Sequence, residues 1–310
     1  MQYRGNNLKR FIFFFTVSFF TIIGIHIYQT SQISLMSSLA NVPSEASSNT
    51  NNTNDSAANM LDSSPVARVG TNRFDDSSII TTEQKVNINL SSLPKILIYH
   101  SHNRESWLPE LKNDVQSADQ AFDPKLNVTL LGDKLKTQLQ KKIKDIPVIH
   151  SKKDYPTVIG SFNYAKSYTY SKATIKEELK LHENIGYLID LHRDSQKREK
   201  TTIRFQNLDY AQVYFVVGTN NPNWQRNMKF AEQIQDGLNA KIPNVSKGIY
   251  KKGNESGNGE YNQSLSANSA LIEIGGVENN LEESYRTIEL LAGVIQNIWV
   301  EDTEHKRIDS

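Results

Sequence analysis

One short stretch constrains the fold of this chain more than any other, because an apolar run ends abruptly in a cluster of polar residues. Residues 96–99 are apolar or aromatic and are typical of a buried strand. The next six residues are His100, Ser101, His102, Asn103, Arg104 and Glu105. Open α/β sheets place their sites at the carboxyl ends of strands, so the stretch predicts a site at this position.

The spacing inside the polar cluster is that of a metal site. His102 and Glu105 are three residues apart, so one turn after the strand can aim an imidazole and a carboxylate at one point. Zinc in hydrolases typically has three protein ligands of these types and a fourth position for water. His100 is expected on the same side of the extended chain as His102, so it is either an alternative ligand or a partner of one.

A second histidine at a strand end is the candidate for the third ligand. Residues 185–191 indicate a buried strand, and His192 follows it. Alternation along the strand puts Asp190 on the same side as His192, so Asp190 or Asp194 is expected to orient the imidazole. A lone histidine is usually a satisfied surface or core residue, but two at strand ends favour a metal site.

A carboxylate inside an apolar run is the candidate catalytic group. Glu273 interrupts residues 270–274, where burial is costly unless the charge has a partner. A desolvated glutamate beside a metal and its water is suited to general-base work on a carbonyl. The alternative is a structural ion pair with a residue such as Arg193. Glu278 is a weaker candidate for the same role, because the last helix is expected to begin near it.

Composition limits the chemistry further. The chain has no cysteine, which excludes disulfides, thiol nucleophiles and thiolate metal sites. The net charge is +1, from 35 basic and 34 acidic residues, so nothing indicates nucleic-acid binding. Residues 197–200 are interpreted as a solvated loop, with contacts to an anionic polymer as the alternative. The tyrosine-rich residues 155–170 are interpreted mainly as packing, with a sugar- or peptide-stacking groove as the alternative.

The N-terminal part differs in composition from the rest. Residues 1–10 carry only basic charges and are expected to stay in the cytoplasm, and residues 11–30 are predicted to be a transmembrane anchor. A signal peptide cleaved near residues 38–40 is the alternative. Residues 31–92 are rich in Ser, Asn and Thr and predict a flexible linker. The protein is therefore expected to be a single-pass protein of the cell membrane with an extracytoplasmic domain.

Residues 93–302 are predicted to form that domain, and residues 303–310 a polar tail. Strands are predicted at 96–99, 147–150, 185–191, 211–217 and 271–274, and helices at 129–142, 175–181, 221–242 and beyond 280. Residues 251–263 are expected to be a loop at the rim of the site. Strands that alternate with helices predict an α/β fold with a mostly parallel sheet flanked by helices.

Three motifs together resemble the signatures of the stage II sporulation protein P family. They are YHSHNRES at 99–106, DLHRD at 190–194 and LIEIGGVEN at 271–279. Their order and spacing agree over roughly residues 93–300, as does the anchor layout, although Ser101 stands where the family usually has threonine. The family is similar to zinc-dependent N-acetylmuramoyl-L-alanine amidases, whose fold is α/β and related to that of zinc carboxypeptidases.

The resemblance implies a zinc-dependent peptidoglycan hydrolase that cuts the amide between N-acetylmuramic acid and the stem peptide, with cross-link cleavage as a further activity. It implies Zn²⁺ held by His102, Glu105 and His192, with Glu273 as the catalytic carboxylate. The setting would be engulfment during sporulation, in the intermembrane space of the sporangium. The implied partners are a lytic transglycosylase and a membrane scaffold protein.

Two other functions fit the same residues. A zinc carboxypeptidase or endopeptidase on wall peptides has the same ligand spacing. A carboxypeptidase would need a buried arginine, and the candidates are Arg104, Arg193 and Arg204. A non-catalytic wall-binding scaffold with a structural metal is the second alternative. Structural zinc is usually closed by four ligands that are often cysteines, so the absence of cysteine favours an enzyme.

Overall fold

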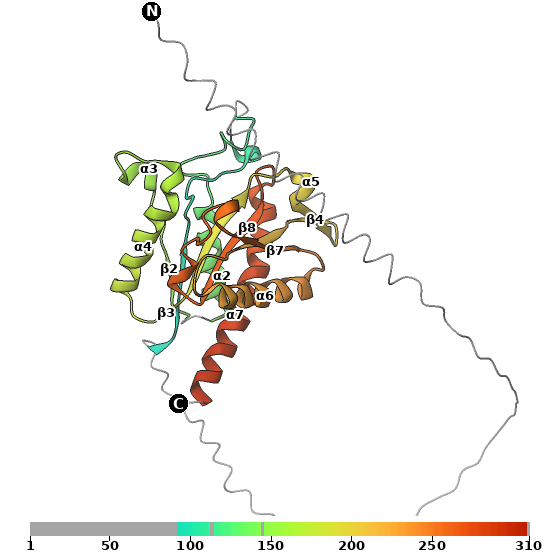
Figure 1. Cartoon of the computed structure of the whole chain (residues 1–310). Coiled ribbons are helices and arrows are strands. Elements are labelled where there is room, and N and C mark those ends of the chain that lie inside the picture. Colours follow the sequence, from blue (N-terminus) through green and yellow to red (C-terminus); the bar gives the residue numbers. More distant parts are fainter. Residues whose placement is uncertain (1–91, 112–114, 144–145, 309–310) are drawn as a thin grey trace, which may run out of the picture. The chain divides into compact units, whose positions relative to one another are not determined.

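A computed structural model describes residues 92–111, 115–143 and 146–308. Within them, six strands form a sheet in the order β2-β1-β3-β8-β6-β7 (Figure 1). The bounds of these strands are β1 Lys95–Tyr99, β2 Val148–His150, β3 Ile185–Asp194, β6 Val213–Gly218, β7 Ser246–Lys252 and β8 Asn268–Gly276. A separate two-stranded ribbon consists of β4 Thr202–Phe205 and β5 Leu208–Ala211.

The sheet is mainly parallel. Strands β2, β1, β3 and β8 run in one direction, whereas β6 is antiparallel to β8 and parallel to β7. The carboxyl ends of β1, β3 and β8 therefore meet at one edge of the sheet, where β6 begins. This arrangement confirms the predicted α/β class with a mostly parallel sheet.

Helices cover both faces of the sheet. Their bounds are α2 Thr129–Lys142, α3 Tyr155–Val158, α4 Ser167–Leu181, α5 Arg198–Thr201, α6 Trp224–Lys241 and α7 Leu281–Ile308. Helices α2, α6 and α7 contribute to the large core; Leu131, Leu135 and Leu139 of α2, for example, are fully buried there. Helix α4 covers the other face, where Ile175 packs on Leu97 and Leu188 (Figure 1).

Alternation along β3 decides which side chains belong to the site. Ile189 and Leu191 enter the large core, whereas Leu188 lies on the α4 face. Asp190 and His192 follow Leu188 at intervals of two residues along the strand, so their side chains also lie on the α4 face. The polar end of β3 therefore faces the layer that contains α4, at the carboxyl edge of the sheet.

Trp299 of α7 closes the opposite edge of the sheet. Its indole Nε1 donates a hydrogen bond to the carbonyl of Pro94, directly before β1, at 2.8 Å. The bond ties the last helix to the amino end of the first strand.

Some elements differ from the sequence predictions. The strand predicted at 211–217 is divided between β5, which ends at Ala211, and β6, which begins at Val213. Lys251 and Lys252 belong to β7 and not to the predicted loop, and α7 continues to Ile308. The predicted anchor at 11–30 and most of the predicted linker lie outside the described residues. No helix within the described ranges has the length and apolarity needed to cross a membrane.

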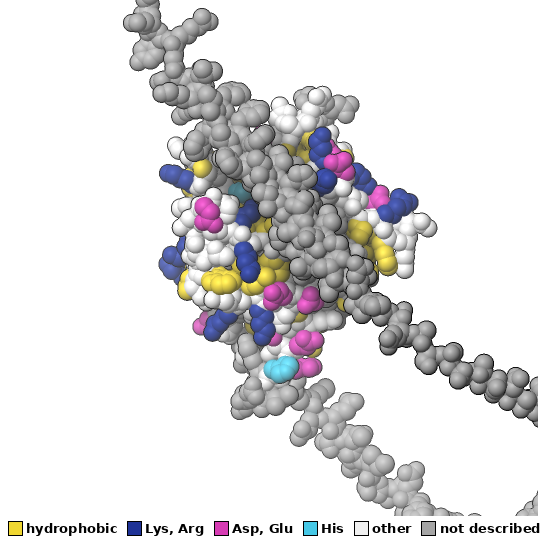
Figure 2. Space-filling view, turned by 45° about the vertical axis from the view of Figure 1, so that its right-hand side comes forward, with side chains coloured by type: hydrophobic (Ala, Val, Ile, Leu, Met, Phe, Trp, Pro, Cys, Tyr) yellow, Lys and Arg dark blue, Asp and Glu magenta, His cyan; other side chains and the backbone are white. Residues whose placement is uncertain are grey.

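The visible surface carries both signs of charge. Figure 2 shows Lys and Arg side chains interspersed with Asp and Glu on the face it presents, together with a band of apolar side chains. This mixture agrees with the net charge of +1.

Candidate metal centre

Two strand ends bring His102, Glu105 and His192 together. Their possible ligand atoms all lie within 4.8 Å of one another. The carboxylate of Glu105 lies between the two imidazoles: Oε1 is 3.1 Å from Nδ1 of His102, and Oε2 is 3.2 Å from Nδ1 of His192. The structure thus groups the three side chains that the sequence indicated as ligands.

The turn after β1 positions Glu105. The backbone N–H of Glu105 donates to the carbonyl of His102 at 3.1 Å, which folds the chain back on itself. The backbone N–H of Arg193 donates to Oε2 of Glu105 at 3.2 Å, so β3 also holds the carboxylate. Burial favours the neutral form of Glu105, but the two histidines outweigh it and hold its pKa well below the ordinary value.

Asp190 lies behind His192. Its Oδ1 is 2.9 Å from Nε2 of His192, an ion-pair distance, although the atoms are not aligned for a hydrogen bond. Asp190 also accepts hydrogen bonds from the backbone N–H of Ser101 at 2.8 Å and from its hydroxyl at 2.6 Å. Burial opposes the charged form of His192, but Asp190 and Glu105 outweigh it and raise its pKa well above the ordinary value.

Glu273 is the cross-strand neighbour of His192 in the register of β3 and β8. Its Oε2 is buried and has no hydrogen-bond partner. Burial is the main cause that raises the pKa of Glu273 to about 8; Glu105 and Asp194 add to the effect, and His192 opposes it. A buried polar atom without a partner is costly, so the carboxylate indicates a site that a ligand completes.

Arg193 does not pair with Glu273. Its Nε donates to the carbonyl of Ser106 at 2.7 Å, and its Nη2 donates to the carbonyls of Ala118 and Ala121 at 3.2 and 3.0 Å. The ion pair that was the alternative explanation of Glu273 is therefore wrong. Arg193 instead fastens the segment after Glu105 to the end of β3.

His100 lies outside the group. Its Nδ1 is 2.9 Å from the carbonyl of Leu191, and its Nε2 is 2.9 Å from Nε2 of His150, whose Nδ1 is 3.1 Å from Asp133. Burial lowers the pKa of His100 to about 3 and that of His150 to about 4. The prediction that His100 and His102 lie on the same side of the chain is wrong. The strand ends at Tyr99, and the following turn directs His102 to the α4 face, where it contacts Tyr164 and Tyr168.

Asp194 and Glu278 do not contact the three grouped side chains. Asp194 accepts a hydrogen bond from the amide of Gln196 at 2.5 Å. Glu278 accepts one from the backbone N–H of Arg198 at 3.1 Å, on the connection between β8 and α7. Of the candidates for orienting His192, the structure therefore places Asp190 beside the imidazole.

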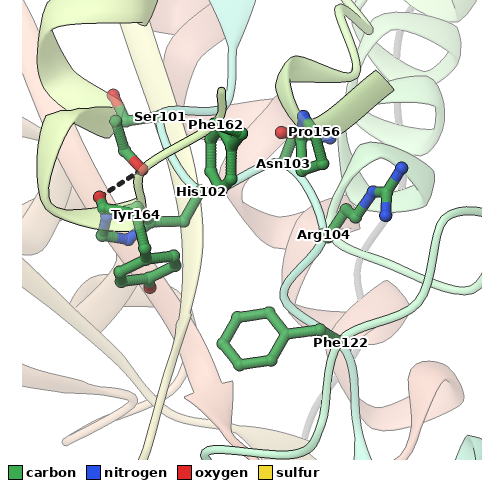
Figure 3. A pocket seen from close by; sticks show the side chains of 9 residues that line it. Ser101, His102, Asn103, Arg104, Phe122, Pro156, Phe162 and Tyr164 are labelled. Carbon is green, nitrogen blue, oxygen red and sulfur yellow. Dashed lines mark hydrogen bonds between the residues drawn. The ribbon is translucent and has the colours of Figure 1, made fainter. Parts of the chain in front are cut away.

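A cavity of about 210 Å³ opens next to His102 (Figure 3). Tyr164 stacks on the His102 ring with a centroid distance of 4.5 Å, and its hydroxyl donates to Oε1 of Glu105 at 3.5 Å. The ring centroids of Phe122 and Tyr164 are 5.7 Å apart, and Phe122 forms another part of the cavity wall. No pattern in the sequence indicated a role for Phe122, which an isolated backbone bridge to Glu105 brings to the site.

The donor set fits a zinc ion. Two imidazoles and one carboxylate are the ligands of several zinc hydrolases, and they leave a further position for substrate or water. A carboxylate behind a ligating histidine, as Asp190 lies behind His192, is the usual support of such a ligand. Phe122 and Tyr164 leave an opening beside the group, as a catalytic centre needs and a closed structural centre does not.

These features define an α/β protein with a candidate mononuclear metal centre at the carboxyl edge of its sheet. The model of the family described as Stage II sporulation protein P matches residues 17–296, and the chain belongs to that family. A Stage II sporulation protein P of Bacillus subtilis (strain 168) is 38% identical over 206 residues, which cover 66% of this chain and 51% of the relative. The chain thus spans about half the length of that curated relative.

Three solved structures are similar at low TM-scores. Cwp6 from Clostridium difficile has a TM-score of 0.40 and 16% identity, over 69% of this chain and 30% of the other. An N-acetylmuramoyl-L-alanine amidase from Clostridium difficile 630 has a TM-score of 0.37 and 12% identity, over 66% of this chain and 96% of the other. A metallo-carboxypeptidase from Burkholderia cenocepacia has a TM-score of 0.40 and 12% identity, over 68% of this chain and 58% of the other. At these values the chemistry must be argued from the site itself.

Proposed function

We propose that this protein is a zinc-dependent peptidoglycan hydrolase that cleaves the N-acetylmuramoyl-L-alanine amide. Family membership supports a role in sporulation. One observation carries the chemistry: His102, Glu105 and His192 converge beside Glu273, whose Oε2 is buried and has no hydrogen-bond partner. Cleavage of peptide cross-links is the second activity in this proposal.

His102, Glu105 and His192 would hold the zinc ion, which when bound polarises a scissile carbonyl and lowers the pKa of water. Asp190 keeps the His192 imidazole in one orientation. Glu273 accepts a proton from the attacking water and passes it to the leaving nitrogen. Burial raises the pKa of its carboxyl, which favours proton acceptance, and the charge of a bound zinc ion would oppose this rise.

The contacts of the three arginines considered for binding a terminal carboxylate favour cleavage of an internal amide over carboxypeptidase activity. A carboxypeptidase needs a guanidinium that is available to a terminal carboxylate. Arg104 is bound by both oxygens of Asp154 at 2.8 and 2.7 Å, and the hydrogen bonds of the Arg193 guanidinium all reach backbone carbonyls. Arg204 pairs with Asp209 on the surface, where its side chain is 65% exposed.

The cellular setting is also part of the proposal. Residues 11–30 would anchor the chain in the cell membrane, residues 31–92 would link the anchor to the domain, and the domain would be extracytoplasmic. It would act on peptidoglycan in the intermembrane space of the sporangium during engulfment. A lytic transglycosylase and a membrane scaffold would be its partners.

Digestion of purified sacculi by the full-length protein in detergent tests the enzyme proposal. The samples contain zinc, a chelator, or the Glu273→Gln variant with zinc, and mass spectrometry identifies the products. We expect intact stem peptides only from the wild type with zinc. Cross-link cleavage alone would change the assignment to an endopeptidase. No product from folded, zinc-loaded protein would favour the non-catalytic scaffold.

A further inference from the structure

The metal group lies between two surfaces of different chemistry. On the β1 side is the cavity of Figure 3, which we call the aromatic cavity; its lining includes Phe122, Pro156, Phe162, Tyr164 and Arg104. On the β6 side, Tyr214 is the cross-strand neighbour of Glu273, and Lys247 of β7 lies over the Tyr214 ring with Nζ 5.9 Å from its centroid. A substrate that crosses the metal group would touch both surfaces.

The aromatic cavity suits an uncharged ring. The side chains of Phe122, Phe162 and Tyr164 border the same space in Figure 3, and Tyr164 continues directly onto His102. The faces of a pyranose ring present C–H groups that pack well on aromatic side chains, with hydroxyls at the rim for the few polar contacts.

Charge argues against an anionic group in this cavity. Arg104 is the cation in its lining, and Asp154 neutralises it through the bidentate ion pair described above. An incoming carboxylate would therefore find no free cation among the side chains that line the cavity.

Lys247 offers the cation that the aromatic cavity lacks. Its side chain is half-buried, and it forms no ion pair with a carboxylate of the described residues, although Asp194 is close enough to favour its charged form. Burial is the main cause that lowers its pKa and outweighs Asp194, so an anionic ligand would relieve the remaining cost of its charge. Tyr250 packs edge-on against Tyr214 at 5.0 Å and continues this surface along β7.

We propose that the two halves of the substrate lie on opposite sides of the metal group: an N-acetylated sugar ring in the aromatic cavity, and the carboxylate-bearing stem peptide along Tyr214 and Lys247. This inference rests on the proposed function, because it assumes a muramoyl-peptide substrate. It assigns specificity to Phe122 and Lys247, neither of which takes part in the bond cleavage.

Binding measurements test this orientation of the substrate independently of catalytic activity. The probes are a peptide-free N-acetylglucosaminyl-N-acetylmuramic acid disaccharide whose lactyl carboxyl is capped as an uncharged amide, and a free stem peptide. Each is titrated by calorimetry into zinc-loaded, full-length Glu273→Gln protein. In that background, Phe122→Ala should weaken disaccharide binding about fivefold to tenfold and leave peptide binding unchanged. Lys247→Gln should weaken peptide binding about fivefold and leave disaccharide binding unchanged. Only the peptide affinity should fall with added salt.

Matched controls are available on both sides. Lys251→Gln removes a lysine from the other face of β7, where its Nζ lies 5.6 Å from the ring of Trp224, and should change neither affinity. Leu208→Ala removes an exposed apolar side chain far along the chain from the cavity, and Phe162→Ala repeats the test if Phe122→Ala fails to fold.

The proposed orientation would be overturned if Phe122→Ala weakened peptide binding and Lys247→Gln weakened disaccharide binding. Equal effects of both variants on both probes, or no effect of either, would overturn it as well. Failure of the proposed function would appear elsewhere, as absent sacculus cleavage by the wild-type protein with zinc. The two failures can therefore be distinguished.

Discussion

His192 and Glu273 stand side by side in the parallel register of β3 and β8, so a candidate ligand and the candidate base leave the same face of the sheet at the same level. The register shifts between His192 and Asp194, directly after this pair. Backbone hydrogen bonds of two central strands therefore set the distance between the two side chains. Such a pair is positioned by the sheet and not by a mobile loop.

Glu273→Gln should abolish turnover and keep the metal. The substitution preserves volume but removes the proton acceptor, so we expect a loss of about 10²–10⁴-fold in the rate of sacculus cleavage. Zinc content, measured by atomic absorption, should stay at one ion per chain. Glu278→Gln is the control, because Glu278 binds the backbone of Arg198 away from the group. Equal activity of both variants would exclude Glu273 as the base.

Asp190→Asn should weaken zinc binding. The variant keeps the shape of a fully buried side chain but removes the charge beside Nε2 of His192, and such supporting changes cost about 10–100-fold in metal affinity. Competition with a chromogenic chelator measures the affinity. Thermal unfolding of the metal-free variant checks that the fold is retained. An unchanged zinc affinity in a folded variant would contradict the role of Asp190.

Gly132→Ala should destabilise the protein although alanine normally favours a helix. A Cβ at Gly132 would lie 2.2 Å from Nε2 of His150 and 2.7 Å from Nε2 of His100, and these buried rings are held by their hydrogen bonds. Overpacking of this kind costs about 1–3 kcal/mol. Gly293→Ala in α7 is the control: its nearest neighbour is 3.8 Å away, so we expect a gain of about 0.4–1 kcal/mol. Urea unfolding of both variants tests the difference.

Asp154 should contribute a small stability increment that disappears in acid. Hydrogen bonds from Arg104 are the main cause that lowers its pKa from 3.8 to about 2. A lowered folded-state pKa means that the contribution is complete above the ordinary pKa and is lost as the pH falls through the lowered one. Because the pair is partly exposed, we expect Asp154→Asn to cost about 0.2–1 kcal/mol near neutral pH.

Urea unfolding across the acid range measures this contribution. The difference between the wild type and Asp154→Asn should shrink as the pH falls from about 5 towards 2. Asp119→Asn, an exposed position, should change stability little throughout. A difference that grows in acid would contradict the sign of the shift.

The sequence was sufficient for the grouping of His102, Glu105 and His192, because strand ends and strand alternation are local patterns. Glu273 could be found because a carboxylate in an apolar run is conspicuous. The direction of His100 could not be predicted, since it depends on where β1 stops and the turn begins. Strand β7 was missed because only one of its seven residues, Ser246, is fully buried, so it has no strong apolar pattern.

The contribution of Phe122 and Lys247 could not be read from the chain either. Phe122 reaches the site through a bridge to Glu105, and Lys247 through the pairing of β7 with β6. Both depend on contacts between segments that are distant in sequence. Tyr164 had a partial signal in the tyrosine-rich segment, but nothing there distinguished it from its neighbours.

Strand β1 gives the domain a front and a back. The chain enters at Pro94, where Trp299 fixes it, and reaches the candidate centre only after the five residues of β1, a path of about 16 Å. The point where the chain enters the domain and the candidate centre therefore lie at opposite ends of β1, and the length of this strand keeps them apart.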